Sequence, residues 1–127
     1  MLVQFNSSGG FITAKITVEG LVNWGFSFDR GPLGVITVKN VNGSSDTISI
    51  GDPGSLDGVL NTWRIFIVNV SNDDQTFRQI TEYMQDGIVI SSSIPEKGDV
   101  KAGTSIKDPI ADFARLFSKK TIKKLRK

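Results

Sequence analysis

The nine residues from 62 to 70 are the longest stretch of this chain that is apolar on both faces of a β-strand. Neighbouring side chains of a strand point to opposite faces. The two apolar sets are Trp63, Ile65 and Ile67 on one face, and Phe66, Val68 and Val70 on the other. A strand with one solvated face would alternate apolar and polar residues. We therefore expect a central strand covered by a second sheet on one face and by a helix over part of the other.

Several shorter segments alternate apolar and polar residues or are rich in β-branched and aromatic residues, and turn residues separate them every 8 to 12 positions. These segments are 11–18, 21–28, 34–41, 46–50, 75–85 and 88–92. Asn42-Gly43 and Asp86-Gly87 are two-residue hairpin signals, and Gly25 inside a strand predicts a bulge or a close backbone approach. Together they predict an all-β fold, an antiparallel β-sandwich of about seven or eight strands.

The end of the chain predicts a helix. Asp108 followed by Pro109 is a typical N-cap and first helical position. Apolar side chains then recur at helical spacing, which gives the apolar face Ile110, Phe113, Phe117 and Leu125, with basic residues opposite. We therefore expect a β-sandwich domain over residues 1–107 and a basic amphipathic C-terminal helix or tail over residues 108–127.

Charge separates these two parts. Residues 1–107 hold eight Lys or Arg and eleven Asp or Glu, a net charge of −3, whereas residues 108–127 hold seven basic and two acidic residues, a net charge of +5. The last nine residues contain six basic side chains: Lys119, Lys120, Lys123, Lys124, Arg126 and Lys127. This cluster predicts a contact with an anionic membrane, with nucleic acid or with a protein partner. The alternative is a helix that packs on the body with its lysines in water.

The chain has no Cys and no His, so it lacks the side chains that most often act as nucleophiles, general bases and transition-metal ligands. Its acidic loops have the composition of turns. We therefore expect no enzyme activity, no metal and no cofactor. Two aromatic residues, Trp24 and Tyr83, are candidates to face a ligand such as a sugar.

These features favour a non-enzymatic binding or assembly module, in which the body recognises a protein or a glycan and the tail contacts a partner or an anionic surface. We expect a protein partner or self-assembly. The alternatives are a membrane-acting, lipid-interface or pore-forming protein that uses the helix, and a lectin-like carbohydrate-binding module. The first residues lack the pattern of a signal peptide and no stretch reaches membrane-spanning length, so we expect a cytoplasmic location.

Overall fold

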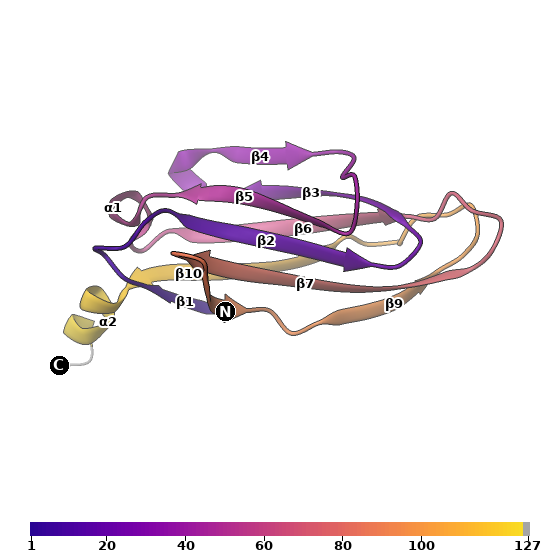
Figure 1. Cartoon of the computed structure of the whole chain (residues 1–127). Helices are drawn as coiled ribbons and strands as arrows, with labels where there is room; N and C mark the ends of the chain where they lie inside the picture. Colours follow the sequence, from indigo (N-terminus) through magenta and orange to yellow (C-terminus); the bar gives the residue numbers. More distant parts are fainter. Residues whose placement is uncertain (126–127) are drawn as a thin grey trace.

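The computed structural model describes residues 1–125 and shows two β-sheets packed face to face (Figure 1). The strands are β1 (Leu2–Phe5), β2 (Ile12–Glu19), β3 (Asn23–Asp29), β4 (Val35–Val38), β5 (Ser45–Gly51), β6 (Leu60–Val68), β7 (Gln75–Gln85), β8 (Ile88–Ser92), β9 (Glu96–Val100) and β10 (Ile110–Ser118). The helices are the 3₁₀ turn η1 (Gly31–Leu33), α1 (Pro53–Leu56) and α2 (Lys119–Leu125).

The first sheet, sheet A, has the strand order β1-β10-β6-β3-β4. The second, sheet B, has the order β5-β2-β7-β8, and β9 pairs with β7 beyond the end of β8. Adjacent strands are antiparallel except β1, which runs parallel to β10. The predicted all-β sandwich with a C-terminal helix is confirmed, with ten strands among the described residues where about seven or eight were expected.

The core is built around β6, which is the middle strand of sheet A as predicted and buries every second side chain. Its residues Trp63, Ile65 and Ile67 are buried against sheet B. A continuous series of aromatic rings crosses the interior from Trp24 through Phe26, Phe28 and Trp63 to Tyr83, with centroids 5.8 to 6.1 Å apart. Such spacing is favourable for tilted, stacked and edge-to-face pairs.

The opposite face of β6 differs from the prediction, because neither a sheet nor a helix formed by residues 1–125 covers it. Phe66 and Val68 are exposed, and so is Val70 just beyond the strand. The outer surface of sheet A is therefore solvent-facing and partly apolar.

The two hairpin signals have different outcomes. Asp86 and Gly87 both have positive φ and join β7 to β8, which confirms that hairpin. The hairpin predicted at Asn42-Gly43, which would pair segment 34–41 with segment 46–50, is wrong: β4 pairs with β3 in sheet A, whereas β5 pairs with β2 in sheet B.

The loop between β4 and β5 crosses from one sheet to the other over Gly25, where an added Cβ would meet the Lys39 carbonyl oxygen at 2.5 Å. The predicted close backbone approach at Gly25 is thus confirmed.

The helix predicted to begin after Asp108 is wrong for residues 110–118. These residues form β10, which lies between β1 and β6, so residues 108–127 are not a separate helical unit. The alternation of this strand is weak, because Asp112 and Ser118 fall on the same face as the buried Ala114 and Leu116. Pairing with β6, and not the local pattern, makes it a strand. Leu116, which lies off the apolar face of the predicted helix, is fully buried in the strand. Between residues 108 and 125, only the seven residues of α2 are helical.

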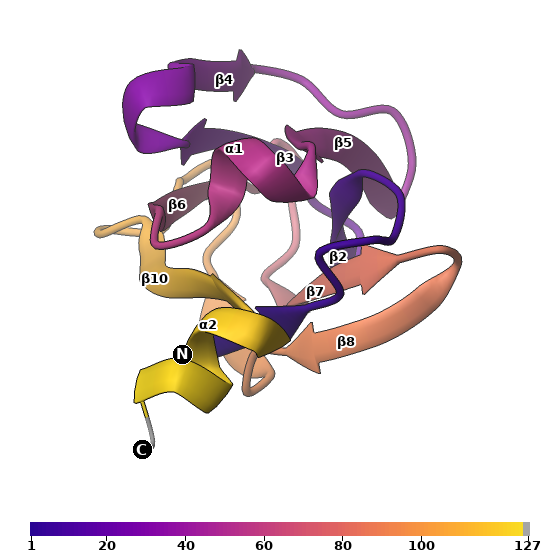
Figure 2. The ribbon, with the colours of Figure 1, turned by 90° about the vertical axis from the view of Figure 1, so that its left-hand side faces the viewer.

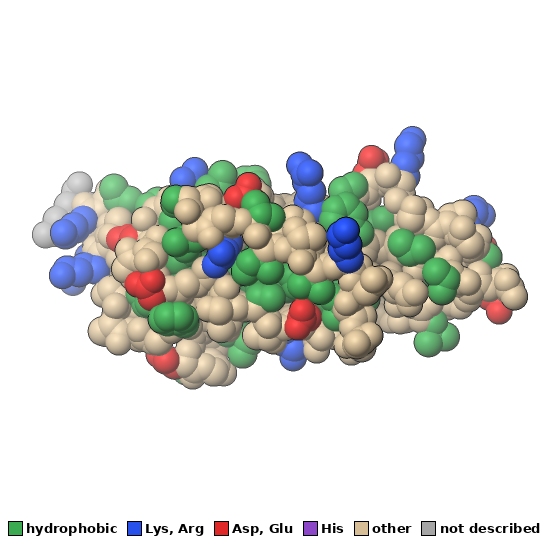
Figure 3. All heavy atoms as spheres, turned by 90° about the horizontal axis from the view of Figure 1, so that it is seen from above, with side chains coloured by type: hydrophobic (Ala, Val, Ile, Leu, Met, Phe, Trp, Pro, Cys, Tyr) green, Lys and Arg blue, Asp and Glu red, His purple; other side chains and the backbone are tan. Residues whose placement is uncertain are grey.

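Helices α1 and α2 lie at the same end of the sandwich (Figure 2). Helix α1 closes the core there with the buried Pro53 and Leu56. Along one side of the molecule, the edge strands β4 and β5 leave a band of hydrophobic side chains (Figure 3). Ile36, Val38 and Ile48 on these strands are half-buried and pack against the core.

Candidate functional site

The lysines of α2 are the densest group of like charges in the described chain. Lys119, Lys120, Lys123 and Lys124 are all exposed on this seven-residue helix, and Figure 3 shows Lys and Arg side chains at that end of the molecule. The exposed Leu125 follows them directly. Arg126 and Lys127, the other two predicted binding residues, lie outside the described residues.

Asp57 attaches α2 to the body. It lies just after α1, and its carboxylate accepts hydrogen bonds from the Ser118 backbone N–H at 2.8 Å and from the Thr121 hydroxyl at 2.6 Å. The Ser118 hydroxyl in turn accepts a hydrogen bond from the Thr121 N–H at 3.0 Å, which makes Ser118 the N-cap of α2. The half-buried Ile122 lies on the same short helix, which contacts β1 and β10. The lysines are therefore presented from a fixed position.

Two opposing effects set the pKa of Asp57. Partial burial raises it, whereas the hydrogen bonds from Thr121 and Ser118 and the positive charge of Lys124 lower it. The lowering effects prevail, so the pKa of this carboxyl lies below its usual range and it is ionised at neutral pH. An ionised carboxylate is also the stronger acceptor for the hydrogen bonds from Ser118 and Thr121.

The four residues of the predicted apolar helix face do not share a surface. Ile110 and Phe117 are half-buried on β10. Phe113 points outward from β10 and is exposed, while Leu125 is exposed on α2. Alternate residues of a strand lie on opposite faces, so Ile110 lies on the other face of β10 from Phe113 and Phe117, and Leu125 belongs to a different element.

Trp24 and Tyr83 do not face a ligand, contrary to the prediction, because both rings are buried in the aromatic core. The Trp24 indole N–H donates a hydrogen bond to the Gly43 carbonyl oxygen at 3.0 Å. The Tyr83 hydroxyl donates to the Asn61 side-chain oxygen at 2.6 Å, and the Asn61 amide donates to the Asp29 carbonyl oxygen at 3.2 Å. Their polar atoms are thus used to connect strands and loops.

The Tyr83–Asn61 hydrogen bond joins the two sheets inside the core, and burial changes the pKa of the Tyr83 hydroxyl. Burial, followed by the negative charge of Asp112, raises the pKa of the Tyr83 hydroxyl far above its usual value, so it remains a hydrogen-bond donor. Within residues 1–125 every buried side-chain polar atom has a hydrogen-bond partner. The core therefore contains no spare polar group aimed at a substrate.

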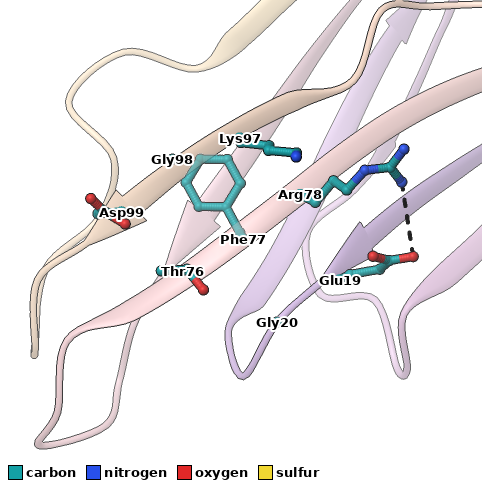
Figure 4. Close-up of a pocket in the computed structure, with 8 residues that line it drawn as sticks. All are labelled: Glu19, Gly20, Thr76, Phe77, Arg78, Lys97, Gly98 and Asp99. Carbon is teal, nitrogen blue, oxygen red and sulfur yellow. Dashed lines mark ion pairs between the residues drawn. The ribbon is translucent and has the colours of Figure 1, made fainter.

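A hollow of about 560 Å³ lies where β9 pairs with the start of β7 (Figure 4). Arg78 of β7 lies opposite Glu19 on one side and Lys97 on the other, and an ion pair of 4.0 Å joins Arg78 to Glu19. Phe77 packs over Gly98, where an added Cβ would meet the ring at 2.8 Å. Only 8% of Phe77 is exposed, so its ring offers little surface on which a sugar could stack.

Within residues 1–125 the side chains and helices are also as follows. No three acidic, His or Cys side chains gather as they would around a metal ion. No helix in this range has the length and apolar character needed to cross a membrane.

Comparison with known proteins informs the fold alone. No family model matches the chain, and no curated protein matches it. A similar solved structure is the crystal structure of a domain of unknown function, DUF4425, from Bacteroides vulgatus, with a TM-score of 0.52 and 8% sequence identity. The match covers 83% of this chain and 94% of that one. At this identity the similarity extends to the β-sandwich and not to any activity.

Proposed function

We propose that the chain is a non-enzymatic binding module that docks on anionic membrane surfaces through α2. The observation that carries this proposal is the set of four exposed lysines held in place by the Asp57 hydrogen bonds. Because the helix is anchored, ordering it on a surface costs little further conformational entropy.

The apolar residue beside the lysines favours lipid over nucleic acid. Leu125 is 68% exposed and could enter the headgroup region as the lysines contact the lipid charges. Binding to single-stranded nucleic acid would use aromatic side chains on which bases stack, and α2 has none.

The strength of this contact can be estimated. A Lys near an anionic membrane contributes about 1 kcal/mol, so four contribute about 4 kcal/mol. Partial burial of Leu125 adds about 1 to 2 kcal/mol. The sum corresponds to a Kd of roughly 40 to 200 μM. This is weak, reversible and salt-sensitive binding.

Vesicle sedimentation of the full chain tests the proposal. The wild type should pellet with anionic vesicles and remain in solution with neutral ones. The triple variant Lys120→Gln/Lys123→Gln/Lys124→Gln should lose binding, whereas the control Lys15→Gln/Lys39→Gln/Lys101→Gln, with the same charge change on the body, should retain most of it. Equal loss in both variants would contradict a role for α2, and a shift of duplex DNA without vesicle binding would assign the lysines to nucleic acid.

A further inference from the structure

The outer face of sheet A carries more exposed apolar surface than a solvated sheet needs. Phe66, Phe113 and Val35 are 45%, 52% and 60% exposed, respectively. They come from β6, from its neighbour β10 and from β4, which β3 separates from β6 in the same sheet, and their placement follows from strand register. The outer face of sheet B shows what a solvated face of this chain looks like, since its paired residues on β2 and β5 are Thr13, Lys15, Thr17, Ser45, Thr47 and Ser49.

Two opposite charges lie among these apolar residues. Arg64 of β6 pairs with Ser27, and Asp29 lies two residues further along β3, opposite Thr62. These residues line a hollow of about 170 Å³ together with Val35. Within residues 1–125 Arg64 forms no ion pair. A face that presents both a cation and an anion beside apolar side chains can be complementary to itself.

We propose that a second copy of this chain docks on the outer face of sheet A in a two-fold symmetric dimer. In such a contact the two-fold axis lies in the plane of the interface. One axis, running between Arg64 and Asp29, brings each Arg64 over the partner subunit's Asp29.

The same axis also brings apolar residues of the two copies together. With about 4.8 Å between strands and about 3.4 Å per residue, it places Phe66 within about 3 Å, measured in the plane of the sheet, of the partner subunit's Val35. It also places Phe113 within about 3 Å of the partner subunit's Phe113 on this lattice. The axis is set by the Arg64–Asp29 pairing alone, and the two apolar pairings follow from it without further adjustment. This agreement favours a second copy as the occupant of this face.

The size of the patch sets the expected affinity. Four strands and six residues along each give a footprint of about 400 Å², about half of the area that each partner buries in a standard interface. The dimer should therefore be weak and depend on concentration.

Sedimentation equilibrium of the full chain, from about 5 to about 500 μM, covers the range expected for so small a contact. The weight-average mass should rise from 13.8 kDa toward twice that value. Arg64→Asp and Phe113→Ser should each raise the dimer Kd about tenfold or more, because the first variant removes two symmetric ion pairs and the second removes both rings of one aromatic contact. Two controls outside the patch, Lys15→Asp on sheet B and Ile94→Ser in the loop after β8, should leave the Kd within about twofold.

Charge exchange separates docking from misfolding. The double variant Arg64→Asp/Asp29→Arg should recover most of the lost dimer, and unchanged circular dichroism should accompany each variant. A mass of 13.8 kDa at every concentration would overturn the proposal. A dimer that is insensitive to both Arg64→Asp and Phe113→Ser would overturn it as well. Since these variants do not alter α2, their results are independent of vesicle binding.

Discussion

Replacing Tyr83 by Phe would remove one hydroxyl and leave its partner buried. The Tyr83 hydroxyl donates to the Asn61 side-chain oxygen at 2.6 Å, and both residues have no exposed surface. The Phe ring keeps the packing against Trp63, whose centroid lies 6.0 Å away. The variant therefore isolates the loss of the hydrogen bond across the core.

The expected loss of stability follows from that burial. An acceptor left unsatisfied in the core costs about 1 to 3 kcal/mol. With an unfolding entropy of about 2.1 cal/mol/K per residue, the 127-residue chain would lose roughly 4 to 11 °C in Tm. Urea denaturation followed by Trp fluorescence would give the free energy of unfolding of each variant, and calorimetry would give the change in Tm.

A double-mutant cycle provides the control. Asn61→Leu removes the acceptor and leaves the Tyr83 hydroxyl without a partner, so the double variant should lose less stability than the sum of the single variants, by about 1 to 2 kcal/mol. Additive losses would refute direct coupling of the two side chains. An unchanged free energy of unfolding in Tyr83→Phe would refute the assignment of the hydrogen bond as stabilising.

Three further predictions concern β10, Asp57 and the Tyr83 hydroxyl. Leu116→Ala should cost about 2 to 5 kcal/mol and Phe113→Ala about 0.5 kcal/mol or less in urea denaturation, whereas a helix in this segment would reverse the order. The depressed pKa of Asp57 means that its stabilising contribution is present above the unfolded-state pKa of about 3.9 and is lost as pH falls through the lower folded-state pKa. Acid should therefore release α2, seen as a change in the Thr121 amide NMR signal that is absent in Asp57→Asn. Because the pKa of Tyr83 is raised in the folded state, its contribution is present below about pH 10 and is lost above it, so absorbance of the chain's single Tyr should show ionisation only as the protein unfolds at alkaline pH.

Much of the body could be predicted from sequence, because alternation is strong where one face is buried. The boundaries of β7 and β8 agree with the predicted segments 75–85 and 88–92. Two edge elements were missed, β1 and β9. Strand β1 has only four residues, too few to show a period, and β9 has a single apolar side chain, Val100. In β9, Gly98 has no side chain, and Phe77 of the neighbouring strand covers it.

The C-terminal segment shows where local patterns are insufficient. Asp108-Pro109 and the spacing of Ile110, Phe113 and Phe117 fit a helix, but sheet A needs a strand beside β6. In the sequence, the apolar Leu116 lies off the predicted helix face, and this is the signal that could have favoured a strand. In the structure Leu116 is fully buried. Tertiary pairing therefore overrides a locally adequate helix pattern.

The candidate sites were also predictable only in part from the sequence. The lysine cluster was visible in sequence because charge density needs no fold to be recognised. Its attachment through Asp57 was not, since Asp57 and Thr121 are 64 positions apart and meet only after folding. Trp24 and Tyr83 were misassigned because each has a polar atom that a core hydrogen bond can satisfy.

Partition of the full chain onto vesicles with an increasing fraction of anionic lipid, at low and at high salt, tests the role of α2 most directly. We expect binding to rise steeply with anionic lipid, to fall as salt increases, and to decrease about tenfold or more on removal of two lysine charges. Binding that is the same for neutral and anionic vesicles, or that does not respond to salt, would contradict the proposed function.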